Sequence, residues 1–99
     1  MRASETQPTL FDFDPGARAA QAARAEQARK TMRAMIDRLA ALTEPPWATH
    51  IEAYEESRVF HHAMEHVPKP EAQAWAAEYR PLADELFGRW IDANVPPDT

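Results

Sequence analysis

The residues best suited to chemistry are three histidines near the middle of the chain, His61, His62 and His66, with Glu65 beside them. In a helix, His62 and His66 share one face because they are four residues apart, so they could supply two of the four ligands of a zinc site. The pattern provides no clear third and fourth ligand, and the HExxH arrangement of zinc proteases is absent. We therefore predict a solvated histidine cluster at the end of a helix, with no metal and no cofactor.

Other catalytic patterns are also missing from the sequence. The chain has no cysteine and only 2 glycines, which argues against disulfides, thiolate metal sites and glycine-rich loops that cradle phosphate. A histidine-activated nucleophile would need Ser4 or Ser57, and neither lies in a recognisable signature. We predict a binding protein rather than an enzyme.

The sharpest feature is a short apolar motif near the amino end, Gln-Pro-Thr-Leu-Phe at residues 7–11, followed by Asp-Phe-Asp. Its large apolar side chains stand in an otherwise polar segment and gain nothing from exposure to water. They are therefore either docked on their own domain or kept for a partner. In the first case, Phe13 would pack as a hydrophobic staple at the start of the first helix. In the second, the candidate partner-binding residues are Gln7, Leu10, Phe11 and Phe13.

This pentapeptide resembles the bacterial sliding-clamp-binding motif, whose usual form is Gln-Leu-Ser/Asp-Leu-Phe. The resemblance implies that Gln7 places its amide in a polar subsite of the clamp, while Leu10 and Phe11 fill an apolar pocket. Pro8 departs from the usual leucine and removes one apolar contact and one hydrogen-bond donor, although it also pre-sets an extended chain. The leading functional prediction is a bacterial or phage accessory factor that docks on the clamp and regulates or inhibits a partner.

Charge is distributed unevenly along the chain, whose net charge is -5. Basic residues predominate in the first predicted helix, and acidic residues predominate after residue 43. The basic side chains could follow the phosphates of a nucleic acid. The acidity of the whole chain favours instead a solvated face, or a face paired with acidic residues, so nucleic acid is not the expected partner. The candidates for this contact are Arg18, Arg29, Lys30 and Arg33.

The acidic part of the chain supports a second functional hypothesis. An antitoxin-like or anti-defence inhibitor would use its helical body to bind the basic surface of another protein, and such a complex would weaken as salt increases. The candidate residues are Glu52, Glu55, Glu56, Glu65, Glu78, Asp84 and Glu85.

Helices must position all of these residues, because no segment alternates polar and apolar residues over the length of a strand. We predict an all-α fold: an extended tail over residues 1–14, a small bundle of three to four helices over 15–95, and a C-terminal tail over 96–99. The Asp-Pro pair at 14–15 predicts the first helix start. Large apolar residues begin only near Met32, so the first half of this helix should either project from the bundle or fray.

A second helix is predicted from Pro46 to about His66, with apolar residues on two faces. Such a helix must contact two partners or bend. One face carries Trp47, Ile51 and Tyr54, and the other carries Val59, Phe60, Ala63, Met64 and Val67.

The last helical period crosses Pro81 without losing phase. It therefore predicts either one helix bent at Pro81 or two short aligned helices that end near Asn94. Gly88, within the last turns, is either tolerated or marks a close helix contact. The repeating positions are Trp75, Tyr79, Leu82, Leu86 and Trp90.

A core of this size is marginal alone, so a homodimer or another protein partner is expected. No apolar run approaches the length of a membrane span, and the first residues lack the pattern of a signal peptide. The sequence therefore predicts a soluble, cytoplasmic protein.

Overall fold

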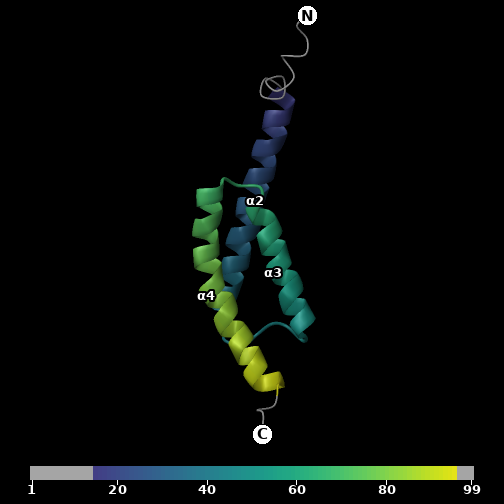
Figure 1. The fold of residues 1–99 in the computed structure, drawn as a ribbon, viewed down its shortest axis with the longest axis vertical. Helices are drawn as coiled ribbons and strands as arrows, with labels where there is room; N and C mark the ends of the chain where they lie inside the picture. Colours follow the sequence, from purple (N-terminus) through teal and green to yellow (C-terminus); the bar gives the residue numbers. More distant parts are fainter. Residues whose placement is uncertain (1–14, 96–99) are drawn as a thin grey trace, which may run out of the picture.

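The computed structural model describes residues 15–95, which form three α-helices and no strand. Helix α2 spans Pro15–Ala41, α3 spans His50–Met64 and α4 spans Lys69–Asn94. Successive helices run in opposite directions, and α3 and α4 both lie against α2 (Figure 1). The all-α class and the small bundle are thus confirmed, with three helices. The predicted tails, residues 1–14 and 96–99, lie outside the described residues.

Helix α2 carries the apolar stripe that its spacing predicted. Met32 is fully buried, and Ile36 and Leu39 are almost so, whereas Ala25 is the first buried residue along the helix. Residues 16–24 are exposed, apart from the half-buried Ala17. We call residues 16–24 the arm, because this part of α2 extends beyond the ends of α3 and α4 (Figure 1).

Helix α3 begins later than predicted. The expected start was Pro46, but the helix starts at His50 with Thr49 as its N-cap. The Thr49 hydroxyl accepts a hydrogen bond from the Glu52 backbone N–H at 3.2 Å, and the Glu52 carboxylate accepts one from the Ala48 N–H at 2.9 Å. This reciprocal capping outcompetes a start at Pro46, and the Thr-x-x-Glu spacing is the sequence signal that would have located it.

The prediction of two apolar faces on α3 also needs correction. Trp47 precedes the helix and is buried, while Ile51 and Tyr54 are 59% and 64% exposed. On the other face, Phe60 and Ala63 are buried as predicted, but Val59 is 52% exposed. The described bundle therefore covers one face of α3 and leaves the other open.

Helix α4 is a single helix that contains Pro81, the first of the two predicted arrangements. Pro81 has no N–H to donate to the preceding turn, and the α4 ribbon changes direction along its length (Figure 1). Tyr79, Leu86 and Trp90 are buried, which confirms that the apolar period continues past the proline.

The core lies where the three helices meet. The rings of Phe60 on α3 and Tyr79 on α4 stack with centroids 3.9 Å apart and an interplanar angle of 13°. Phe60, Met32 and Leu39 are the largest fully buried side chains, so each helix is fixed by apolar contacts with the others. None of the three helices is long and apolar enough to cross a membrane.

Candidate protein-interaction sites

The apolar motif of the amino end, with Gln7, Leu10, Phe11 and Phe13, lies outside the described residues. The next segment of the chain is described. Helix α2 begins at Pro15, and its arm has no buried residue before Ala25. The motif is therefore connected to the bundle through an exposed helical segment rather than directly.

Two basic residues of α2, Arg29 and Arg33, pair with acidic residues of α4. Arg29 makes two hydrogen bonds to Glu71, from Nε to Oε2 at 2.6 Å and from Nη2 to Oε1 at 2.9 Å. The Trp75 indole N–H donates to the same carboxylate at 3.0 Å. The hydrogen bonds from Arg29 and then Trp75 lower the pKa of Glu71 to about 2. The pKa of Arg29 is raised, chiefly by its hydrogen bond with Glu71.

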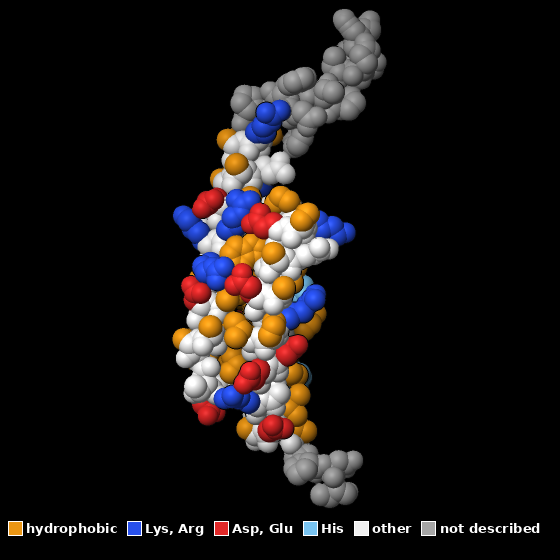
Figure 2. All heavy atoms as spheres, turned by 90° about the vertical axis from the view of Figure 1, so that its left-hand side faces the viewer, with side chains coloured by type: hydrophobic (Ala, Val, Ile, Leu, Met, Phe, Trp, Pro, Cys, Tyr) orange, Lys and Arg blue, Asp and Glu red, His pale blue; other side chains and the backbone are white. Residues whose placement is uncertain are grey.

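Arg33 is engaged one turn further along α2. It contacts Glu78 at 3.2 Å and Asp37 at 3.6 Å, and its guanidinium lies 4.8 Å from the Trp75 ring centroid. Positive and negative side chains accordingly alternate on the face seen in Figure 2. Two of the four residues considered for nucleic-acid contact, Arg29 and Arg33, thus pair with carboxylates of the same chain. Arg18 and Lys30 are exposed on α2.

The seven carboxylates proposed to bind a basic protein in the inhibitor hypothesis make different contacts within the fold. Glu56 joins α2, α3 and the loop between them, because it accepts hydrogen bonds from Arg38 at 2.8 Å and from the Trp47 indole at 2.8 Å. Glu52 caps α3, and Glu78 pairs with Arg33. Glu55, Glu65 and Glu85 pair within their own helices or turns, with Arg58, His62 and Arg89 respectively. Asp84 instead borders a groove between α3 and α4.

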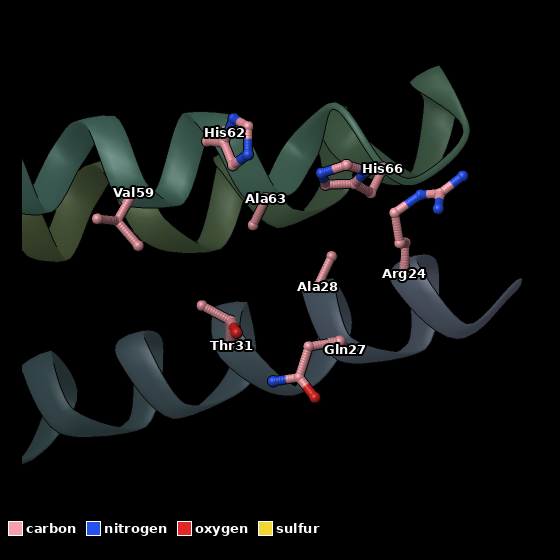
Figure 3. A pocket seen from close by; sticks show the side chains of 8 residues that line it. All are labelled: Arg24, Gln27, Ala28, Thr31, Val59, His62, Ala63 and His66. Carbon is pink, nitrogen blue, oxygen red and sulfur yellow. The ribbon is translucent and has the colours of Figure 1, made fainter. Parts of the chain in front are cut away.

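Within the described part of the chain, the histidines contact their own helix and each other. His61 contacts its own helix, with Nδ1 2.8 Å from the Ser57 carbonyl oxygen, while His62 and His66 have ring centroids 5.2 Å apart. Within residues 15–95, no group of three or more His, Cys, Asp or Glu side chains is arranged to hold a metal ion. His62 and His66 instead line a shallow depression of about 260 Å³ between α2 and α3, with Arg24 at the His66 end (Figure 3).

The feature that sequence reasoning missed is the groove between α3 and α4. It has a volume of about 390 Å³ and is lined mainly by aromatic and small side chains, including Trp47, Tyr54, Tyr79 and Phe87. A signal was present in the sequence: Ala83 and Phe87, which line the groove, lie four residues apart beside the core stripe, and Ile91 continues the spacing beyond the groove. These residues belong to a second apolar stripe on α4. It was overlooked because it lies next to the stripe that packs in the core.

Comparison with known proteins assigns this three-helix chain to no class. No protein-family model, no curated protein and no solved structure matches it. Function must therefore be argued from the chain's own residues.

Proposed function

We propose that this chain is a non-enzymatic protein-binding factor that docks on the bacterial replication sliding clamp through residues 7–11. The observation that carries the proposal is the position of the motif. Residues 7–11 lie just ahead of the exposed arm, and at 1.5 Å per residue the nine arm residues span about 13 Å. A motif at the far side of this spacer can enter a partner's pocket while the bundle stays outside it.

The chemistry of the motif defines what the partner must offer. Gln7 needs a polar subsite, and Leu10 and Phe11 need a deep apolar pocket, since burying two large apolar side chains supplies most of the binding free energy. Pro8 restricts the chain to extended conformations and lowers the entropy lost on binding. The helical body then blocks, recruits or regulates another protein at the clamp.

The test is a binding measurement with purified sliding clamp. We expect the double substitution Leu10→Ala, Phe11→Ala to weaken binding at least about tenfold, which corresponds to about 1.4 kcal/mol. The control is Val59→Ala, which removes an exposed apolar side chain from α3 and should leave clamp binding unchanged. Equal binding by all three proteins, or no binding by any, contradicts the proposal.

A gain-of-function variant makes the test sharper. Pro8→Leu restores the usual residue of the motif, with its apolar contact and its backbone N–H. We expect tighter binding than with the unmodified chain, measured in the same assay. Weaker binding would show that residues 7–11 do not bind as the clamp motif does.

The inhibitor hypothesis, in which the acidic body binds a basic protein, stays a prediction. The geometry gives it less support, because Glu56 and Glu78 already pair with arginines of α2.

A further inference from the structure

One surface of the described bundle is apolar, exposed and unused by the clamp proposal. We call it the open face; it comprises Ile51, Tyr54, Phe87, Ile91 and Val95, which are 59%, 64%, 36%, 39% and 48% exposed. Ring contacts connect α4 with the start of α3 and with the loop before it: the centroids of His50 and Trp90 are 6.2 Å apart, and those of Trp47 and Phe87 are 6.4 Å apart. The two helices that carry the open face are thus held together.

Gly88 is a second, independent observation on this surface. It lies inside α4, where glycine weakens a helix, and a Cβ added there would meet no atom within 4 Å. The described bundle therefore gives no steric reason for glycine at this position. Ile91 and Val95 follow it at spacings of three and seven residues, so Gly88 lies on their side of the helix. A missing side chain there leaves a hollow that another helix could approach.

The spacing of the apolar residues on α4 suits packing against the α4 helix of a second copy. Phe87 and Ile91 form a ridge of residues four apart on α4, and Val95, the C-cap residue after the helix, continues the spacing. Two such ridges pack with their helix axes crossing at about 50°. If two α4 helices cross antiparallel near Gly88, Phe87 of each copy faces Ile91 of the other. The ridge is therefore self-complementary under a two-fold axis.

The open face supplies the apolar part of the area that a dimer interface requires. From their exposed fractions, its five side chains present about 500 Å², taking about 200 Å² for a whole large side chain. A stable interface buries about 800 Å² per partner, and the rim residues around the groove can supply the remainder.

We propose that two copies of this chain associate through the open face, with their α4 helices crossing at Gly88. The chain's own apolar motif, residues 7–11, is a poorer candidate for binding the open face, because it precedes the end of α2 that lies farthest from this face. The 27 residues of α2 extend about 40 Å from Pro15 toward the end of the bundle that bears the open face. Leu10, five residues before Pro15, reaches only about 17 Å.

Charge gives the dimer a recognisable salt dependence. Asp84 and Asp92 lie on α4 next to the open face, and the chain has a net charge of -5, so two copies repel each other. Added sodium chloride screens this repulsion and should tighten the dimer. A basic protein bound to the same face would show the opposite trend, which separates the two occupants.

The experiment is sedimentation equilibrium of the full chain over a wide concentration range, with folding checked by circular dichroism. We expect a monomer–dimer equilibrium, weakened at least about tenfold by Phe87→Glu. The control is Val59→Glu, which places the same charge at another exposed apolar site, on α3 and away from the open face. A monomer at every concentration, or dissociation by Val59→Glu but not by Phe87→Glu, would overturn the proposal.

Gly88→Leu tests the crossing point separately, because its two expected effects have opposite signs. Leucine is a better helix former than glycine and has open space in the isolated chain, so the thermal midpoint of dilute monomer should rise. The same side chain fills the hollow needed by the partner helix, so dimer formation should fall. A leucine variant that dimerises as strongly as the unmodified chain would refute the contact at Gly88. The arms lie at the other end of the bundle, so these results do not depend on clamp binding.

Discussion

At the scale of single residues, Glu71 is a carboxylate that accepts hydrogen bonds from side chains of two helices. It accepts hydrogen bonds from Arg29 on α2 and from Trp75 on its own helix, and these hold its pKa at about 2 rather than 4.5. The pairing also shows why an excess of basic residues on one helix need not indicate a nucleic-acid site. Arg29, Arg33 and Arg38 of α2 pair with carboxylates on α3 and α4.

The pKa of Glu71 predicts a dependence of stability on pH. Because the folded pKa is lower than the unfolded one, this carboxylate stabilises the fold above about pH 4.5, and the contribution disappears as the pH falls toward about 2. We expect Glu71→Gln to destabilise the chain near neutral pH and to flatten the loss of stability between these values. The measurement is the free energy of unfolding of both proteins, obtained from urea unfolding across this pH range.

The control for this prediction is Glu44→Gln, in the loop after α2, where the carboxylate bonds to none of the described residues. Its stability should follow that of the unmodified chain at every pH. If Glu71→Gln and Glu44→Gln gave the same pH profile, the Arg29–Glu71 pair would not stabilise the fold.

At the scale of elements, the start of α3 is set by its cap rather than by the two prolines before it. Thr49→Ala removes the oxygen that satisfies the Glu52 N–H, and we expect a loss of about 1 kcal/mol of unfolding free energy. The matched change Thr43→Ala, at an exposed site where only the backbone carbonyl accepts a bond from Arg89, should cost less than about 0.5 kcal/mol. Equal losses in thermal or urea unfolding would argue against the cap.

At the scale of the whole molecule, stability depends on a small core shared by three helices. Phe60 is fully buried against Tyr79 from another helix, so Phe60→Ala should cost about 3–5 kcal/mol, a large fraction of the total for a domain of this size. Val59→Ala, at the neighbouring exposed position, should change stability little. If the two variants unfolded at similar urea concentrations, Phe60 would not be central to the core.

Removal of the amino-terminal segment separates the body from the motif. Among the described residues, the core begins at Ala25, and we expect deletion of residues 1–14 to leave the helical content and the thermal midpoint nearly unchanged. The same deletion should abolish clamp binding but not dimer formation. Loss of the fold on deletion would mean that the segment packs on the bundle.

The sequence by itself determined the helices. Alanine-rich segments, proline boundaries and four-residue apolar spacing act within a few turns, so local physics predicted the α2 stripe, the α4 stripe and the exposed arm. The Thr-x-x-Glu cap was equally local, and it could have corrected the start of α3. The apolar motif was also recognisable from residue types alone, although its role stays a prediction.

Only the tertiary structure decided which side chains meet across helices. No local rule could pair Arg29 with Glu71 or Arg33 with Glu78, because these partners lie more than forty residues apart and meet through the relative position of α2 and α4. The same holds for the open face. Ile51 and Phe87 have the composition of core residues, and they stay exposed because three helices enclose only one side of α3 and α4.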